Sequence, residues 1–314
     1  MKKILKYMYI VNYPTFEEEL CLLEMRAVFG KEPQEKMLFS NVEFNPSNSP
    51  FIKTRLDVLY EKDSFEELLS EISKDKNLYD NFKLEYVRLN KNNIPYEERL
   101  GLIKEISMNI QGVHNFKNPQ FSFGITKVEG KWLFGIDNKN NYKWHSHDNK
   151  PCSYSNSLSV KVAKAVVNIA NNGLKEKTII DPCCGVGTTL VEGLDAGYII
   201  DGYEINKSIA KNANINLEFY GFKPVVVNDD MHNIKKEYDS SIVDIPYGIF
   251  SHTSQEDQRK IVETARRISN KMVMISFEDH DAMIEKEGFE IVDRCAVTKG
   301  RFKRYIVVAK KKMR

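Results

Sequence analysis

The chain has 314 residues, of which 42% are hydrophobic and 29% are charged. This composition is that of an ordinary folded, soluble protein, and the length suits two or three domains better than one core. The formal net charge is only +2, which excludes a uniformly polycationic binder, so any affinity for nucleic acid must come from local basic patches.

The cysteines and the apolar runs indicate the compartment. The five cysteines include no Cys-x-x-Cys pair, which is typical of a reducing compartment and predicts no zinc module. The N-terminus is basic, but Lys6 interrupts the apolar stretch, so no signal peptide is expected. No run approaches membrane-spanning length. We therefore expect a cytoplasmic protein with no membrane partner.

The sequence of the N-terminal half predicts that strands and helices alternate along the chain. Its first part is expected to contain a strand, a helix and short strands at Tyr7–Tyr13, Phe16–Phe29 and near Leu38–Glu43. Its second part is expected to contain a strand, a helix and a strand at Phe82–Arg88, Tyr96–Ile110 and Phe121–Ile125. The polar segment 137–144 then predicts a linker. His145 and His147 follow it, but no carboxylate or cysteine cluster accompanies them, so we expect polar linker residues and no metal site.

The first chemical motif follows a short run rich in β-branched residues. Lys177–Ile180 predicts a buried parallel strand with Asp181 at its carboxyl end, the edge at which open parallel sheets bind ligands. Gly185 and Gly187 allow a tight turn and the close approach of a ligand, and either of the next two threonines can cap the following helix. The residues expected to contact a nucleotide-type cofactor in this turn are Asp181, Pro182, Cys183, Gly185, Gly187 and Thr188.

The next two strands add acidic residues to the same edge. The strand Tyr198–Tyr203 ends in Glu204, about 20 residues after the glycine turn, the spacing at which a carboxylate reaches a ribose diol. The third strand, Pro224–Val227, leads to two carboxylates that could accept from an adenine amino group, and we favour the second of them. Leu190 stands where a dinucleotide fingerprint needs a third glycine, so an NAD site is not expected. The further cofactor contacts expected here are Glu204, Ile205, Asp229, Asp230 and Met231.

The second chemical motif predicts how an amine is held. The strand Ser241–Val243 runs into Asp244-Ile245-Pro246-Tyr247 at the same edge of the sheet. A nucleobase amine is a weak nucleophile, so its nitrogen must be held facing the methyl donor. The carboxylate of Asp244 and the carbonyl of Ile245 can accept its two hydrogens while Tyr247 stacks on the base, and Pro246 directs that carbonyl outward. Together the motifs predict metal-free methyl transfer from S-adenosylmethionine (SAM) to a nucleobase nitrogen, with these four residues as the catalytic ones.

The C-terminal half of the chain resembles a known family. Residues from about 150 to the end look like the SAM-dependent RNA methylases that make N2-methylguanosine in tRNA, whose loop reads Asp-Pro-Pro-Tyr. Here Ile245 replaces the first proline, which keeps the backbone acceptor and frees Asp244 from the restriction that a following proline imposes. The segment Lys150–Leu158 also resembles the family, which implies that Ser157 lines the methionine side. The resemblance implies an α/β, Rossmann-like class I methyltransferase domain with a mostly parallel seven-stranded sheet and an antiparallel edge hairpin.

The N-terminal half is similar to the THUMP domain, a tRNA-binding module, over its strand, helix and strand and the connection Gly112–Pro119. The elements ahead of it resemble the small domain that accompanies THUMP. The resemblance implies tRNA, or another structured RNA, as the partner, bound in part through Lys117, and a small activator subunit in some members. The predicted domains are a small α+β domain (1–55), an α+β THUMP-like RNA-binding region (56–137), a linker and cofactor-lining segment (138–158) and the methyltransferase domain (159–314).

A basic turn near the C-terminus is a second candidate RNA contact. Lys299–Arg304 places four cations around Phe302, between the expected strands Glu290–Val297 and Tyr305–Ala309. Cations with an aromatic side chain beside the active-site sheet favour contact with RNA. The expected RNA-binding residues here are Arg301, Lys303 and Arg304.

The function predicted from the sequence is methylation of the N2 amine of a tRNA guanosine that is extruded from its stack. Two alternatives stay open. A DNA methyltransferase that acts on the adenine or cytosine amino group uses the same kind of loop, and a catalytically silent SAM- and RNA-binding protein would follow if Ile245 spoils the loop. Methylation of a protein glutamine ranks low, because those enzymes carry Asn at the position of Asp244.

Overall fold

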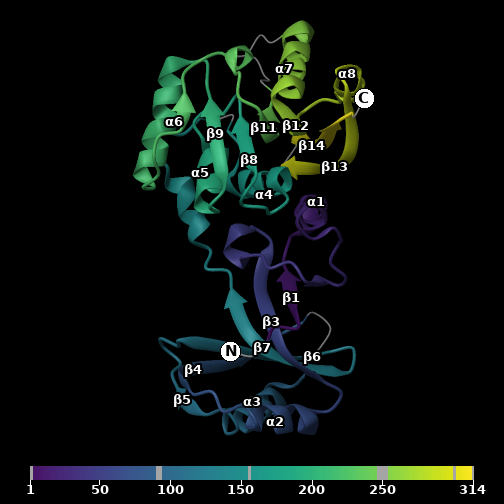
Figure 1. The fold of residues 1–314 in the computed structure, drawn as a ribbon, viewed down its shortest axis with the longest axis vertical. Coiled ribbons are helices and arrows are strands. Elements are labelled where there is room, and N and C mark those ends of the chain that lie inside the picture. The colour runs from purple at the N-terminus through teal and green to yellow at the C-terminus, as the bar shows by residue number, and fades with distance from the viewer. Residues whose placement is uncertain (1–2, 90–93, 155–156, 246–253, 300–301, 313–314) are drawn as a thin grey trace. The chain divides into compact units, whose positions relative to one another are not determined.

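The chain folds into two compact units. The computed structural model describes residues 3–89, 94–154, 157–245, 254–299 and 302–312 (Figure 1). The first unit comprises residues 1–12, 33–46 and 51–141, and the second comprises residues 13–32, 47–50 and 142–314. Each unit has its own seven-stranded sheet.

The first unit is built on a mixed sheet with two helices. Its elements are β1 (Lys6–Val11), β2 (Met37–Ser40), β3 (Ile52–Lys62), α2 (Phe65–Ser73), β4 (Tyr79–Tyr86), α3 (Tyr96–Ser107), β5 (Gly112–His114), β6 (Phe121–Val128) and β7 (Lys131–Lys139). The strand order is β2-β1-β3-β7-β6-β4-β5, with β4 parallel to β5 and β6 and the other pairs antiparallel. The two helices close one core with the strands, in which Leu68, Phe82 and Ile106 are fully buried.

The predicted elements of the N-terminal half are confirmed in type and order. The predicted strand, helix and strand of its second part correspond to β4, α3 and β6, and the connection between α3 and β6 contains the short edge strand β5. The segment predicted as a linker begins differently, because Asp137–Lys139 complete β7 and Asp137 is buried there. Short 3-10 segments accompany the helices in the described residues: η1 (Thr15–Glu17), η2 (Pro46–Asn48), η3 (Lys143–Asn149) and η4 (Met231–Asn233).

The second unit has the predicted mostly parallel sheet. Its strands are β8 (Thr178–Asp181), β9 (Ile199–Tyr203), β10 (Val226–Val227), β11 (Tyr238–Asp244), β12 (Ser269–Ser276), β13 (Phe289–Lys299) and β14 (Phe302–Lys311), in the order β10-β9-β8-β11-β12-β14-β13. The first five in this order are parallel, and β14 is antiparallel to both of its neighbours. The chain order reverses between β8 and β11, which puts the ligand crevice at their carboxyl ends. The predicted α/β fold with an antiparallel pair at one edge is confirmed.

The helices of the second unit cover this sheet. They are α1 (Glu18–Phe29), α4 (Val160–Asn171), α5 (Thr188–Asp195), α6 (Lys207–Phe219), α7 (Gln255–Ile268) and α8 (Asp281–Lys286). On one face of the sheet, α7 and α8 close a core in which Val243, Met274 and Ile284 are fully buried. In the described part of the chain, no helix combines the length and the apolar character needed to cross a membrane.

The predicted helix at Phe16–Phe29 belongs to the second unit. The prediction placed it in a small N-terminal domain, but β1 and β2 join the sheet of the first unit, whereas α1 packs on α4 and β13. Arg26 of α1 makes a two-pronged ion pair with Asp293 of β13, with both N–O distances at 2.8 Å. The second unit therefore includes a helix from the start of the chain.

A buried polar network fixes α1 to α4. Glu24 is fully buried, and its two oxygens accept from Asn168 Nδ2 and Ser49 Oγ, each at 2.6 Å. Asn168 also donates to the carbonyl of Asn48 at 2.8 Å and accepts from the hydroxyl of Tyr198 at 2.8 Å. Because each of these buried groups has a partner, the network specifies one seating of α1.

We expect Glu24→Gln to remove a pH-dependent loss of stability. Burial raises the pKa of Glu24 from 4.5 to about 7, so the folded chain holds a proton that the unfolded chain has released. The stabilisation is complete below pH 4.5 and is lost as the pH rises towards 7, a change of about 3 kcal/mol. Gln stays neutral and can keep both contacts. Urea unfolding should therefore give similar free energies of unfolding at pH 5 and a more stable variant at pH 8, whereas parallel pH profiles would contradict this assignment.

Candidate functional site

The carboxyl ends of the parallel strands meet around Cys183. Its Sγ lies 3.6 Å from the Sδ of Met231, which follows β10. The N–H of Cys184 donates to the carbonyl of Tyr203, the last residue of β9, at 2.9 Å. Burial raises the pKa of the Cys183 thiol, and four carboxylates raise it further; they belong to Asp181, Glu204, Asp244 and Asp230. The acidic residues of both sequence motifs therefore gather at one edge of the sheet.

The glycine turn has the backbone that only glycine adopts readily. Gly185 and Gly187 have φ angles of +53° and +81°. A side chain at position 185 would meet nothing within 4 Å, so this turn borders open space. The predicted threonine caps are wrong, because Gly187 is the N-cap of α5 and no side chain caps it. Thr189 instead donates to Asp181, and the Oγ1 of Thr188 is buried with no hydrogen-bond partner among the described residues.

Asp181 holds this turn in shape. It is 3% exposed; Oδ1 accepts from the N–H of Cys183 at 3.2 Å, and Oδ2 accepts from the hydroxyl of Thr189. Burial raises the pKa of Asp181 to about 7, against the effect of these two hydrogen bonds, and the charge of Glu204 raises it further. Its carboxyl group thus joins the end of β8 to the first turn of α5.

Glu204 lies directly against the glycine turn. Its Oε2 accepts from the N–H of Gly185 at 3.1 Å and its Oε1 from the N–H of Asn206 at 2.8 Å. Asn228 Nδ2 donates to the carbonyls of Glu204 and Ile205 at 2.9 and 3.0 Å, which ties the ends of β9 and β10 together. The side chain of Ile205 is 71% exposed and offers an apolar surface beside the carboxylate.

The two adjacent aspartates after β10 have different hydrogen bonds. Asp230 caps η4 by accepting from the N–H of His232 at 2.8 Å. Asp229 accepts from the N–H of Asp230 at 2.7 Å and from Asn233 Nδ2 at 2.8 Å. Met231 is 5% exposed and packs in the core. The preference for Asp230 as the adenine acceptor stays a prediction.

Asp244, the last residue of β11, carries an unpartnered acceptor. Its Oδ1 is buried and has no hydrogen-bond partner within the described ranges. Burial raises the pKa of Asp244 to about 7; the charge of Arg304 opposes this increase and that of Asp181 adds to it. A buried acceptor without a donor costs about 1–3 kcal/mol, so a ligand that brings a donor is favoured here. This is what the predicted grip on an amine requires.

Ile245 uses the backbone N–H that a proline lacks. This N–H donates to the carbonyl of Ile275 in β12 at 3.1 Å. The side chain of Ile245 is 2% exposed and belongs to the core cluster of α7 and α8. The departure from Asp-Pro-Pro-Tyr therefore extends the hydrogen bonding of β11 to β12 beyond Asp244.

We expect Ile245→Pro to destabilise the protein rather than repair its loop. The variant leaves the carbonyl of Ile275 without its donor, which costs about 1–3 kcal/mol, and removes part of a buried side chain, which costs a similar amount. Urea unfolding should show a loss of about 2–4 kcal/mol, compared with about 1 kcal/mol for Ile245→Val, which keeps the N–H. A proline variant as stable as the valine variant would contradict this role of the N–H.

Several predicted residues are not tested by this geometry. Pro246, Tyr247 and Arg301 lie outside the described residues. Ser157 donates its hydroxyl to the carbonyl of Tyr154 within one turn. Lys117 is exposed in the first unit, after β5. Their functional roles stay predictions.

The basic turn is shorter than expected. Lys303 and Arg304 are strand residues of β14, in register with Thr298 and Val297 of β13. Because neighbouring residues of a strand project to opposite faces, Lys303 and Arg304 do not share one surface. The sequence pattern suggested a single basic patch, and the strand divides these two cations.

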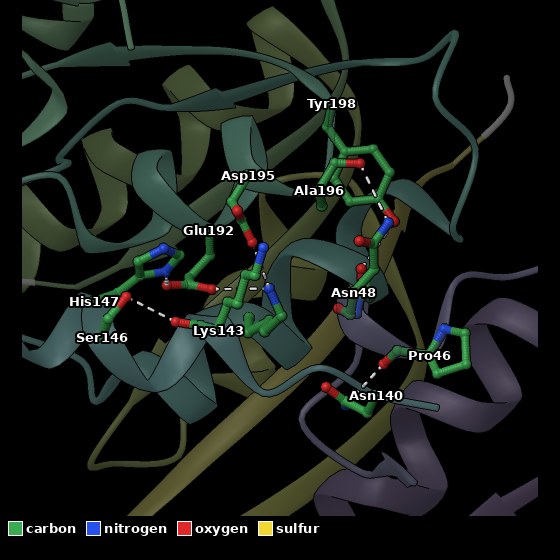
Figure 2. A network of polar contacts seen from close by, with 12 residues as sticks. Pro46, Asn48, Asn140, Lys143, Ser146, His147, Glu192, Asp195, Ala196 and Tyr198 are labelled. Carbon is green, nitrogen blue, oxygen red and sulfur yellow. Dashed lines mark hydrogen bonds and ion pairs between the residues drawn. The ribbon is translucent and has the colours of Figure 1, made fainter. Parts of the chain in front are cut away.

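A buried charged cluster holds the segment before α4 and was missed in the sequence. His147 Nδ1 lies 2.6 Å from Glu192 Oε1, and Lys164 Nζ lies 3.1 Å from Glu192 Oε2 and 3.2 Å from Asp195 Oδ2. Figure 2 shows the ring of His147 turned towards Glu192. The prediction of a polar linker without a carboxylate partner is thus wrong at His147, which is buried in η3. His147, Glu192 and Asp195 have the spacing of metal ligands, but the Lys164 ammonium already pairs with both carboxylates, and we assign no metal here.

Part of the chain is similar in sequence to known proteins. Residues 147–286 match the family model described as UPF0020, RMKL-like, methyltransferase domain. The chain is 31% identical over 160 residues to the tRNA (guanine(10)-N2)-dimethyltransferase of Pyrococcus abyssi. The matched residues make up 47% of each protein. It is 30% identical over 115 residues to the enzyme of that name from Methanothermobacter thermautotrophicus. The matched residues make up 36% of this chain and 34% of the relative. The chain thus matches about half, or less, of the length of these relatives.

A solved structure, that of TrmN from Thermus thermophilus, is similar to the chain with a TM-score of 0.48 and 12% identity, over 98% of this chain and 100% of the other. The family match covers the end of η3, the glycine turn, the acidic strand ends and the Asp244 loop. Over residues 147–286, the chain is therefore similar to the methyltransferase domain of the RMKL-like UPF0020 family.

Proposed function

We propose that this protein transfers a methyl group from SAM to the exocyclic N2 amine of a guanosine in tRNA. The observation that carries the proposal is the buried Oδ1 of Asp244, which has no hydrogen-bond partner among the described residues, at the sheet edge shared with Asp181 and Glu204. The relatives that share this part of the chain are named tRNA (guanine(10)-N2)-dimethyltransferases, which favours tRNA guanosine over a DNA base.

The residues at the glycine turn fit SAM. A ligand can approach the backbone at Gly185, where a Cβ would meet open space. Glu204, beside this turn, would hold the ribose hydroxyls, and Ile205 offers an apolar surface for the adenine ring. The buried hydroxyl of Thr188 has no hydrogen-bond partner in the described part of the chain and is available to a polar group of the cofactor. SAM supplies a methyl group on a sulfonium, which is electrophilic enough to need no metal.

Asp244 has the chemistry to hold and deprotonate an amine. Its ionised carboxylate accepts hydrogen bonds from the exocyclic amine and keeps the nitrogen lone pair directed at the methyl group, so positioning supplies most of the acceleration. As the nitrogen bonds to the methyl carbon, the bond from that carbon to the sulfonium sulfur breaks, the neutral thioether leaves, and the nitrogen carries an extra proton. A carboxylate whose pKa is about 7 can accept that proton near neutral pH. The predicted stacking by Tyr247 and the outward carbonyl of Ile245 complete the proposal.

The first unit is proposed to bind the RNA. Its order of β4, α3, β5 and β6 is compatible with the THUMP-like prediction. In this proposal the THUMP-like region grips the tRNA, Lys117 contributes a cation, and the target guanosine is extruded into the catalytic unit. The need for a small activator subunit and a location in the cytoplasm are parts of the same proposal.

Transfer of labelled methyl from SAM to tRNA tests the function directly. Bulk tRNA from a strain that lacks this gene is incubated with the protein, and its nucleosides are separated by mass spectrometry, with duplex DNA as the competing acceptor. We expect the label in N2-methylguanosine or N2,N2-dimethylguanosine. Label in DNA would establish the rival methyltransferase instead, and SAM and RNA binding without transfer to either acceptor would favour the silent binding protein.

A further inference from the structure

Strand register places Arg304 on the same face of the sheet as Asp244. Asp244 is in register with Ile275 of β12, and Ile275 is in register with Ile306 of β14. Residues in register on neighbouring strands project to the same face, and so do residues two apart on one strand. Arg304 precedes Ile306 by two residues, so its side chain leaves β14 on the face of Asp244, close to the carboxyl end of β12.

Phe277 holds the guanidinium at this position. The Cζ of Arg304 lies 5.1 Å from the centroid of the Phe277 ring, within the range of a cation–π contact. Phe277 directly follows β12, which ends at Ser276. The side chain of Arg304 is only partly exposed. The guanidinium of Arg304 is therefore held by a packed aromatic ring and is not a fully solvated surface cation.

The charges around Asp244 are few. In the parts of the chain that the structure covers, Asp181 of β8 and Arg304 of β14 act on this carboxylate, with the Cys183 thiol beside them. Asp181 disfavours the ionised form of Asp244, and Arg304 favours it. Arg304 is thus the positive charge that opposes burial and Asp181 at this position.

We propose that Arg304 is a positioning residue that keeps Asp244 ionised, in the state that accepts the hydrogens of the substrate amine. The proposal rests on the proposed function and gives Arg304 a role apart from RNA binding. It makes the ionisation of Asp244 depend on a residue from the antiparallel edge pair. The side chain needs to supply a positive charge here, and lysine should replace it in part.

Arg304→Gln, Arg304→Lys and Lys310→Gln form the test set. Lys310 lies on the same strand, six residues and roughly 20 Å farther along, and its replacement removes the same charge. Methyl transfer to tRNA is measured from pH 6 to 9 at saturating SAM. We expect Arg304→Gln to move the midpoint of the rate profile upward by about one pH unit, with a roughly fivefold loss of rate at pH 7 and recovery at pH 9. Arg304→Lys and Lys310→Gln should keep the midpoint near that of the parent protein.

A second readout does not require turnover. The carboxyl carbon of Asp244, labelled with ¹³C and assigned by comparison with Asp244→Asn, is titrated by NMR in the parent protein and in Arg304→Gln. An upward shift of its titration midpoint supports the proposal even if no acceptor is methylated, which would count against the proposed function alone. An unchanged titration, or an equal loss of rate at every pH with Arg304→Lys as impaired as Arg304→Gln, would overturn it.

Discussion

Replacement of Asp244 by Asn is expected to reduce methyl transfer to tRNA about 100- to 1,000-fold, the range found when a group that stabilises developing charge in an active site is removed. Asn has nearly the same shape, but it is neutral and places an NH₂ donor where the substrate amine needs an acceptor. It also cannot take the proton that the amine releases. The dissociation constant for SAM should stay within about threefold of the parent value, because the cofactor residues proposed here lie on other strands.

The same substitution should leave the fold intact. Burial raises the pKa of Asp244 from 3.8 to about 7, so the carboxyl group stabilises the fold below pH 3.8 and loses that contribution as the pH rises to 7. The Asn variant should therefore be at least as stable as the parent protein at pH 8. Asp148→Asn, at an exposed site of the same unit, is the control and should transfer methyl normally. An Asp244→Asn variant that folds, binds SAM and keeps more than a tenth of the rate would exclude the role assigned to this carboxylate.

The sequence predicted the strand ends of the catalytic unit because their signals are local. Each parallel strand is a short apolar run, and Asp181, Glu204 and Asp244 each stand at, or directly after, the last residue of such a run. In a parallel sheet those ends share one edge, so the convergence around Cys183 followed from position along the chain alone. The antiparallel edge pair was expected from the family resemblance rather than from a local pattern, since Ile306–Ala309 of β14 form a continuous buried apolar run.

The parts that the sequence did not predict depend on contacts between distant segments. Nothing near α1 indicates that it packs on α4 and β13, because its apolar face suits either unit. One signal was present in the residues: Glu24 and Lys164 each interrupt the apolar face of a helix, as a buried and partnered charge does. Ile245 could be seen as a departure from the family loop, but its hydrogen bond to Ile275 could not.

Basic residues were the least predictable. The four cations in six positions predicted one exposed turn. In the structure both strands of the hairpin extend into this segment, so its side chains project alternately to the two faces of the sheet. Arg304 thereby comes to the face of Asp244, which composition could not indicate. A run of charged residues in a hairpin predicts a single charged surface only when the length of the turn is known.

Glu192→Ala should have the largest effect on stability of the substitutions considered. Glu192 is fully buried and contacts both Lys164 and His147, so its removal leaves one buried ammonium with only Asp195 and one imidazole without its acceptor. Removing one partner of a buried ion pair costs about 3–5 kcal/mol. In a unit of this size the midpoint of thermal unfolding should fall by roughly 10 °C.

Two further variants separate burial from charge pairing. Glu263→Ala removes a carboxylate that is 59% exposed and lies 3.2 Å from Arg259 in α7; it should cost no more than about 1 kcal/mol. The double variant Lys164→Met, Glu192→Leu replaces the central pair by apolar side chains, and it should recover a large part of the loss because no unpaired ammonium remains. If Glu192→Ala unfolded at the same temperature as Glu263→Ala, the cluster would stabilise the fold no more than a surface pair does. Recovery in the double variant would instead show that the cost of the single variant lies in the stranded charge of Lys164, and that the cluster specifies where η3 docks on α4 and α5 more than it adds net stability.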